Sequence, residues 1–413
     1  MISSHLSPQS PKRPDVEGVL LVMGLDVAAL VASAHNAGYR VQVADFFGDL
    51  DVQAVAERSL SLMRQVPGRS CGWVREAFSE EALVDLARRM ARDCSFDGIL
   101  LSSGLEDAPD ALEKLEDVAP ILGNAPEAIT RVRDKRRFFE WLERHDILHP
   151  RMQIVSGPTE AARVARELGY PVVVKSMVGF GGANVRLTRN EEELAHSIQA
   201  EGDILVQEYV EGVAASTSVI AAHGRSVTLT VNRQLLGLPS LGSPEAFSYC
   251  GNVVPLDASE VVLSRCVDVS ARVAEAFGLV GSNGIDLVID GAGRTWVIEV
   301  NPRFQGTLEC VERVLGINLV EAHIDACREG RLPVLGRREG YCVRLILYGR
   351  GRSSVPDLRV FPEARDVPVP GVIVERGEPL CSVVVEGDSS GSALLRGFEV
   401  TEAIYSSLSR CED

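Results

Sequence analysis

Residues 284–303 carry the side chains best suited to do chemistry. Two alternating apolar runs flank an Asp-Gly-Ala-Gly turn, a pattern that predicts a β-hairpin. Strand side chains alternate between two faces, so Asp286 on the first strand can converge with Glu299 and Asn301 on the second. Two carboxylates and an amide oxygen are hard ligands that suit Mg²⁺, whose coordination shell phosphate oxygens can complete. The hairpin therefore predicts a divalent-cation site.

Arg303 lies two residues beyond Asn301 and can reach the same face of the hairpin. Its planar, always-charged guanidinium suits a phosphoryl group. A metal site beside an arginine is typical of phosphoryl transfer. A hairpin with a solvated polar face would also explain these residues, so the decision depends on the neighbouring motifs.

A second set of residues is suited to bind a nucleotide. Lys175 ends an apolar strand-like run and precedes a glycine-rich turn, which can bring backbone N–H groups close to phosphate oxygens. The spacing is not that of a P-loop. The segment at 207–211 could pair its backbone with an adenine edge, although a strand end running into a turn explains it equally well. Lys135 lies in a basic helix whose simplest explanation is a solvated face.

Length and composition restrict the class of protein. The 413 residues exceed one typical core, so we expect two or three domains. A formal net charge of −16 argues against a nucleic-acid partner, because neutralising phosphates needs a surplus of Lys and Arg. Nine scattered cysteines without a C-x-x-C pair are typical of a reducing cytosol, and no apolar run is long enough to cross a bilayer. We expect a cytoplasmic protein with no membrane partner.

The predicted elements divide the chain. A βαβ rhythm predicts a small parallel sheet over residues 15–122, after a loose Ser/Pro-rich tail at residues 1–14. A capped helix beginning near Asn124 is predicted to run without interruption to about His145. Short β-like runs separated by Gly and Pro predict a small β-rich segment at residues 336–413.

Taken in order, the motifs resemble the ATP-grasp superfamily, and more closely its carboxylate–amine ligase branch related to biotin carboxylase. The motifs are Leu-Gly-Asn-Ala-Pro-Glu at 122–127, Arg-Asp-Lys at 133–135, Val-Val-Lys at 173–175, Gly-Phe-Gly-Gly at 179–182, Gln-Glu-Tyr-Val-Glu at 207–211 and Ile-Glu-Val-Asn-Pro-Arg at 298–303. The resemblance implies an α/β (α+β) ATP-grasp fold. Its ATP-grasp domain would span residues 123–335, with a glycine-lid subdomain at about 150–210. The α/β domain before it matches by pattern only.

The resemblance also implies roles for the residues that match these motifs. The implied ATP-binding residues are Lys135, Lys175, Gly179, Gly181, Gly182, Glu208, Tyr209, Val210 and Glu211. The implied ligands of Mg²⁺ (or Mn²⁺) are Asp286, Glu299 and Asn301. Arg303 and Lys175 would be catalytic, with Arg303 stabilising the transferring γ-phosphoryl group. Asp286 departs from the longer glutamate of relatives, which puts the number of bound metals in doubt.

The reaction implied by the resemblance has two steps. A substrate carboxylate attacks the γ-phosphate of MgATP, giving an acylphosphate and ADP, and an amine then displaces phosphate to form an amide. Two alternatives stay open: a carboxylase-like reaction with bicarbonate, and a regulator that binds ATP without turnover. The complete metal and arginine set exceeds what passive binding requires.

Nothing in the sequence names the two small-molecule substrates. Gln305 and Gly306 follow the metal motif, so we expect them to contact substrate. Arg233 or Arg344 could bind a second carboxylate of an acidic substrate, although a surface arginine is the simpler explanation of either. A homodimer is compatible with the resemblance.

Overall fold

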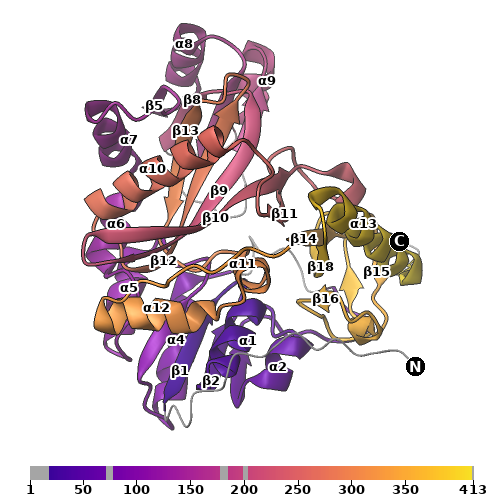
Figure 1. Ribbon diagram of the computed structural model, residues 1–413. Helices are drawn as coiled ribbons and strands as arrows, with labels where there is room; N and C mark the ends of the chain where they lie inside the picture. The colour runs from indigo at the N-terminus through magenta and orange to yellow at the C-terminus, as the bar shows by residue number, and fades with distance from the viewer. Residues whose placement is uncertain (1–17, 71–77, 177–184, 199–202, 412–413) are drawn as a thin grey trace.

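The computed structural model describes residues 18–70, 78–176, 185–198 and 203–411. Four sheets organise them: two of four strands, one of eight and one of three. In Figure 1 the N-terminal sheet lies at the bottom, the eight-stranded sheet in the middle and a smaller four-stranded sheet at the top. The elements beyond residue 340 lie on the right, where they include three strands of the eight-stranded sheet.

The N-terminal sheet is parallel, as the βαβ rhythm predicts. Its strands, in spatial order, are β3 (Arg58–Ser61), β2 (Arg40–Asp45), β1 (Val19–Gly24) and β4 (Gly98–Leu101). Its helices are α1 (Ala28–Asn36), α2 (Leu50–Val55), α4 (Glu80–Ala91) and α5 (Pro109–Glu116). All six residues of β1 are buried, since both faces of a parallel sheet are covered. The side chains that reach the site therefore come from the loops after these strands.

The sheet at the top of Figure 1 is antiparallel and carries the residues before and after the glycine-rich turn. Its strands, in spatial order, are β5 (Met152–Ser156), β8 (Asp203–Glu208), β6 (Val172–Ser176) and β7 (Val185–Thr188), with helices α8 (Pro158–Leu168) and α9 (Glu191–Ser197). Its small core is mostly valine and alanine, including Val172, Val174 and Val206. Because Val172 and Val174 face this core, strand alternation turns Val173 and Lys175 to the opposite face of β6.

The eight-stranded sheet is antiparallel throughout. Its strands, in spatial order, are β13 (Thr295–Asn301), β12 (Gly281–Asp290), β9 (Gly212–Ala222), β10 (Arg225–Leu236), β11 (Tyr249–Val254), β14 (Tyr341–Tyr348), β18 (Pro379–Gly387) and β16 (Ala364–Arg365). The last three strands lie beyond residue 335, so one sheet joins the central segment to the C-terminal segment.

The helix predicted to begin near Asn124 is two helices, so the expectation of one uninterrupted helix is wrong. They are α6 (Pro126–Arg133) and α7 (Lys135–Arg144). Asp134 between them has extended ψ of 99°, and its carboxylate accepts a hydrogen bond from the Arg137 N–H at 3.2 Å. An aspartate that caps a new helix competes with continuation of the old one. The remaining helices of the central segment are α10 (Glu260–Ala276), α11 (Leu308–Leu315) and α12 (Leu319–Glu329).

The C-terminal segment is less β-rich than the sequence suggests, because it also contains helix α13 (Ser390–Ser407). The helix begins with a capping box formed by Ser389 and Ser392. It buries Ala393, Gly397, Thr401 and Ile404, a face of mostly small residues that gives little apolar periodicity. The short elements beside it are β15 (Ser353–Ser354), β17 (Ile373–Val374), β19 (Ser409–Arg410) and two 3₁₀ turns, η1 (Pro239–Leu241) and η2 (Leu358–Val360).

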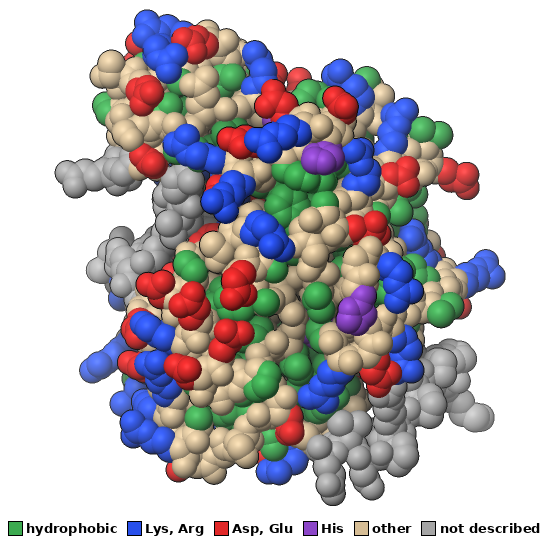
Figure 2. Space-filling model, turned by 90° about the vertical axis from the view of Figure 1, so that its left-hand side faces the viewer, with side chains coloured by type: hydrophobic (Ala, Val, Ile, Leu, Met, Phe, Trp, Pro, Cys, Tyr) green, Lys and Arg blue, Asp and Glu red, His purple; other side chains and the backbone are tan. Residues whose placement is uncertain are grey.

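Basic and acidic side chains are interspersed over the face drawn in Figure 2, with apolar side chains in small groups between them. Within the described ranges, no helix is both long enough and apolar enough to cross a membrane.

Candidate active site

The hairpin of β12 and β13 brings the three predicted metal ligands together. Asp286 pairs directly with Glu299 across the two strands, and Gly284 pairs with Asn301, so the three side chains share one face. The Asn301 Nδ2 donates to Asp286 Oδ2 at 3.1 Å. The Gln234 Nε2, from the nearby strand β10, donates to Asp286 Oδ1 at 2.9 Å. The group thus forms a continuous polar surface at one edge of the sheet.

Basic residues approach these carboxylates from the break between α6 and α7. Lys135 Nζ lies 2.9 Å from Glu299 Oε2, and Arg133 Nη1 lies 3.7 Å from the same oxygen. Arg133 is held in place by an ion pair with Asp107 at 2.7 Å. Because Asp134 interrupts the helix, the residues on both sides of it can face Glu299. Lys135 is therefore an ion-pair partner within the site rather than part of a solvated face.

The charges shift each other's protonation. Burial by itself would raise the pKa of Glu299, but Lys135, Arg133 and Lys175 together hold it well below its ordinary value. Burial raises the pKa of Asp286 to about 7, and the neighbouring Glu299 adds to the effect. Burial lowers the pKa of Lys175 to about 8, against the attraction of Glu299. Lys175 thus faces the two carboxylates from the edge of the upper sheet.

These donors fit a magnesium ion. Asp286 and Glu299 oppose each other's ionisation, a penalty that a cation between them would relieve. Among the described residues no three His, Cys, Asp or Glu side chains gather as a metal site. A metal would therefore be held by two carboxylates and the Asn301 amide oxygen, with further oxygens from its ligands, which is the usual arrangement for Mg²⁺ with a nucleotide.

Arg303 is held at the junction of the hairpin and the N-terminal sheet. Its Nε donates to Glu106 Oε1 at 3.0 Å, its Nη1 to the Phe304 carbonyl at 2.8 Å, and its Nη2 to Asn301 Oδ1 at 3.4 Å. Glu106 lies on the loop after β4 and is buried. No sequence signal marks Glu106, because its partner is far away in the chain. The contacts point the guanidinium at the metal ligands.

The nucleotide residues of the upper sheet are only partly described. Gly179, Gly181 and Gly182 lie outside the described residues. Glu208 accepts a hydrogen bond from Arg151 Nε at 3.0 Å. The structure places Tyr209 and Val210 half-buried after β8, with Glu211 exposed. The adenine and ribose roles of residues 208–211 stay predictions.

The expected substrate residues occupy different places. Gly306 lies where a Cβ atom would meet Arg344 Nη1 at 3.0 Å, so the chain passes close to that guanidinium. Gln305 lies against Gly284 on the hairpin of β12 and β13, which carries the candidate metal ligands and is called the metal hairpin below. The Gln305 side chain donates to the Arg303 carbonyl. Arg233 is exposed, and strand alternation turns its side chain away from Gln234. The structure thus brings Gln305 and Gly306 to the site and leaves Arg233 outside the group.

Several polar residues that sequence reasoning missed share the face of Asp286. Ser216 pairs with Asp286 and with Asn232 in register, and Asn252 pairs with Arg344 two strands further along. Polar residues at alternate positions of otherwise apolar strands were the signal available for them. Together they form a row across the eight-stranded sheet, from the metal ligands to Arg344.

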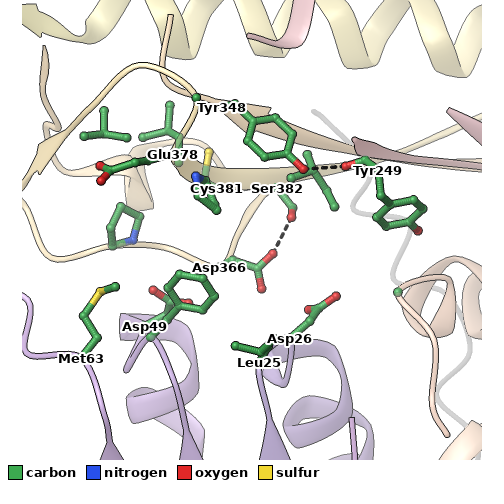
Figure 3. A pocket seen from close by; sticks show the side chains of 18 of the residues that line it. Leu25, Asp26, Asp49, Met63, Tyr249, Tyr348, Asp366, Glu378, Cys381 and Ser382 are labelled. Atoms are coloured by element: carbon green, nitrogen blue, oxygen red, sulfur yellow. Dashed lines mark hydrogen bonds between the residues drawn. The ribbon is translucent and has the colours of Figure 1, made fainter. Parts of the chain in front are cut away.

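A cavity of about 300 Å³ lies at the far end of this row, between the loops of the N-terminal sheet and the C-terminal strands. Figure 3 shows Asp26 and Asp49 reaching into it from the N-terminal side and Asp366 from the opposite wall. Arg303 and Gly306 also line it, so the cavity adjoins the metal hairpin. Its volume is at the lower end for a small-molecule site.

Comparison with known proteins identifies one domain of the chain. Residues 132–307 match the ATP-grasp domain family. The chain therefore carries an ATP-grasp domain, and the resemblance inferred from the motifs is confirmed. The range includes both lysines, the metal hairpin and Arg303.

Two relatives in sequence illustrate the extent of the match. An uncharacterised protein of Methanocaldococcus jannaschii is 23% identical over 370 residues, which are 89% of this chain and 88% of that protein. The carbamoyl phosphate synthase large chain of Rubrobacter xylanophilus is 26% identical over 301 residues, which are 70% of this chain. The match spans only 28% of the synthase chain.

Solved structures share the fold along nearly the whole chain. The biotin carboxylase domain of Hydrogenobacter thermophilus 2-oxoglutarate carboxylase, a dimer with MgADP, ADP and bicarbonate, has a TM-score of 0.69 at 17% identity, covering 95% of this chain and 90% of that one. The L-amino acid ligase of Bacillus licheniformis has a TM-score of 0.69 at 17% identity, covering 95% and 98%. The N5-carboxyaminoimidazole ribonucleotide synthetase of Thermotoga maritima has a TM-score of 0.67 at 18% identity, covering 96% and 100%. At such identities the likeness is one of fold.

Proposed function

We propose that the protein is an ATP-dependent ligase that joins a carboxylate to an amine through an acylphosphate. One observation carries the proposal: Asp286 and Glu299 face Lys135 and Lys175, and the neighbouring Arg303 also lines a cavity sized for a small molecule. Carboxylates that can hold a metal, surrounded by cations, suit a nucleoside triphosphate. The adjoining cavity offers a place for the molecule that receives the phosphoryl group or displaces it.

The side chains divide the work of phosphoryl transfer. Asp286, Glu299 and Asn301 would hold Mg²⁺ (or Mn²⁺), which supplies charge neutralisation for the phosphate oxygens when bound. Lys135 and Lys175 neutralise the remaining phosphate charge. Arg303, fixed by Glu106, presents its guanidinium to the γ-phosphoryl group while that group moves.

The proposed reaction balances in two steps. An oxygen of the substrate carboxylate forms a bond to the γ-phosphorus as the bond to the ADP oxygen breaks, giving an acylphosphate. The nitrogen of a neutral amine then bonds to the acyl carbon, phosphate leaves with the electron pair, and the nitrogen releases a proton. The acylphosphate must be kept from water between the steps, and burial of the site between two sheets serves that purpose.

The proposal is tested by product analysis. The protein is incubated with MgATP and pooled small carboxylates and amines, and ADP, AMP and phosphate are measured separately. We expect substrate-dependent ADP and phosphate, reduced by about 1,000-fold in Glu299→Gln because a ligand of the metal and the partner of Lys135 is lost. The exposed Glu140→Gln on α7 is the matched control and should keep its rate. Release of AMP and pyrophosphate would contradict the acylphosphate route.

Bicarbonate as the carboxylate is the second candidate, because the fold matches the bicarbonate-bound biotin carboxylase domain as well as it matches the amino acid ligase. Carrying out the same assay in buffer stripped of bicarbonate distinguishes the two. ADP formation that needs added bicarbonate would favour carboxylation. A homodimer in the cytoplasm is the proposed setting, since that domain was solved as a dimer.

A further inference from the structure

The cavity beside Arg303 has an unusual balance of charge. Most of its lining is apolar, including Leu25, Phe47 and Met63, as is usual for a ligand pocket. Four carboxylates also line it: Asp26, Asp49, Asp366 and Glu378. Among the lining residues that the structure describes, the cations are Arg303, which is bound to Glu106 and Asn301, and Arg344. Acidic side chains therefore outnumber the basic groups available to them.

Most of these acids have a structural partner. Arg344 donates to Asp26 at 2.7 Å and to Asp366 at 2.8 Å, and Ser382 also donates to Asp366. Asp51, beside the cavity, accepts the backbone N–H groups of residues 366 and 367 at 2.9 and 3.1 Å. Glu378 accepts the backbone N–H of Glu375 at 2.7 Å. Protein contacts therefore account for Asp26, Asp51 and Asp366 and for one oxygen of Glu378, whose Oε1 is buried without a hydrogen bond in the described part of the chain.

Asp49 is different. Its residue is only 7% exposed, and the one hydrogen bond that the described residues donate to its carboxylate comes from Gln65 Nε2 at 2.9 Å. It precedes α2, but its side chain does not cap that helix. Burial raises its pKa well above the ordinary value, and the nearby Asp366 and Asp51 raise it further. A buried carboxyl group that faces other acids and has no cation is costly to keep.

The position of Asp49 relates it to the candidate reaction. Arg344 Nη1 donates both to Asp26 and to the Gly306 carbonyl, so the Asp26 end of the cavity adjoins the metal hairpin. Figure 3 shows Asp49 further along, beyond Asp366 and next to Met63. A molecule in the cavity can therefore reach Arg303 with one end and Asp49 with the other.

We propose that the cavity binds the amine substrate and selects one with a second, cationic group, an ammonium or guanidinium, held between Asp49 and Asp366 on a short apolar chain. This rests on the proposed ligase function and names the class of its amine. An ammonium supplies the donors that Asp49 lacks and the positive charge that the acids lack. An anionic end is disfavoured, because Arg344 is already engaged by Asp26 and Asp366.

Binding to the ATP-free protein tests the proposal apart from turnover. The probes are 1,5-diaminopentane and, as a matched anion of the same chain length, pentanoate, measured by titration calorimetry or ligand-observed NMR. We expect the diamine to bind and pentanoate not to bind. The Asp49→Asn variant should weaken the diamine by about 10- to 100-fold, the loss of a hydrogen bond to a charged group. The exposed Asp110→Asn on α5 removes the same charge elsewhere and should leave binding unchanged.

Stability distinguishes a lost ligand contact from a damaged fold. Removing the charge of Asp49 relieves repulsion, so Asp49→Asn should unfold at the same or a higher urea concentration than the wild type. Equal diamine affinity in wild type and Asp49→Asn, binding of pentanoate in preference, or no binding of the diamine would each overturn the proposal. If the diamine binds as expected but no amine supports ADP release, the ligase function fails while the cation pocket stands. If other amines support ADP release without diamine binding, only the pocket assignment fails.

Discussion

The metal hairpin and the cavity next to it have opposite balances of basic and acidic side chains. At the hairpin, Lys135, Lys175 and Arg303 surround two carboxylates, and an anionic nucleotide with its metal would complete the balance. Among the described residues that line the cavity, the acids outnumber the cations, and no described basic side chain hydrogen-bonds to Asp49. The proposed ligase would use this asymmetry to hold a triphosphate at one end and an amine at the other.

Replacing Arg303 should have the largest effect on activity, because this residue contacts the metal hairpin and also lines the cavity. We expect Arg303→Ala to lower kcat by about 100- to 1,000-fold, since a donor to the transferring group is lost, with a much smaller change in ATP affinity. Arg294→Ala, an exposed arginine at the turn of the same hairpin, is the control. Rates of ADP release measured with saturating ATP decide the matter, and similar rates in the two variants would contradict the assigned role.

Replacing Arg344, which lines the cavity, should lower the free energy of unfolding. Arg344 is 4% exposed, and Arg344→Met leaves Asp26 and Asp366 without their cation. We expect a loss of about 3 kcal/mol in the free energy of unfolding, at the lower end for a broken buried pair because both acids are partly exposed. Urea denaturation measures it. Adding Asp366→Asn to this variant should recover part of the loss, and a further loss would argue against charge as the cause.

His323, which accepts a hydrogen bond from strand β12, should make the stability of the protein fall at acid pH. It is 2% exposed, its Nε2 donates to the Leu122 carbonyl, and its Nδ1 accepts the Ser282 N–H at 2.8 Å. Burial lowers its pKa to about 4. The unfolded chain takes up a proton below about pH 6.5 while the folded one does not, so about 3 kcal/mol of stability should be lost as the pH falls from 6.5 to 4.

Unfolding midpoints measured across that pH range check the prediction. In His323→Gln this part of the pH dependence should disappear. In His35→Gln, which changes an exposed histidine on α1, it should remain. A slope that is the same in all three proteins would show that other groups are responsible.

The pH dependence of nucleotide binding should show the smallest effect. With the pKa of Asp286 raised to about 7, protons compete with the metal below pH 7. With the pKa of Lys175 lowered to about 8, the lysine loses its charge above pH 8. MgATP affinity should therefore be highest between about pH 7 and 8 and fall by at most about tenfold for each pH unit beyond either limit. Lys175→Arg should abolish the alkaline decline, and a decline that persists in this variant would assign it to another group.

Part of the site could be predicted from the sequence because it is local. Alternation along β13 is enough to place Glu299 and Asn301 on one face. A register shift between Asp286 and Leu287 then pairs Asp286 with Glu299, where regular alternation from the turn would pair it with Ile298, so only the structure brings all three side chains together. The residue types of this hairpin then indicate the metal and the phosphoryl group. The parallel N-terminal sheet is equally readable, since its strands and helices alternate within a short length of chain.

The rest could not be predicted, because it depends on contacts between distant segments. Glu106 meets Arg303, and Arg344 meets Asp26, across hundreds of residues. Asp134 could not be predicted either, although it acts locally. The helical sequence pattern continues through Asp134, but its side chain caps a new helix there, and Lys135 at the start of that helix contacts Glu299. Helix α13 was not predicted, because its buried face consists mostly of small residues and gives little apolar periodicity.

The sequence by itself determined which residue types stand on the two strands of the hairpin, and those types are the basis of the proposed chemistry. Only the tertiary structure decided the electrostatic character of the two regions. Whether a cation lies beside Asp49 depends on which side chains surround it after folding. Burial then raises the free-energy cost of a carboxylate that has no cation beside it.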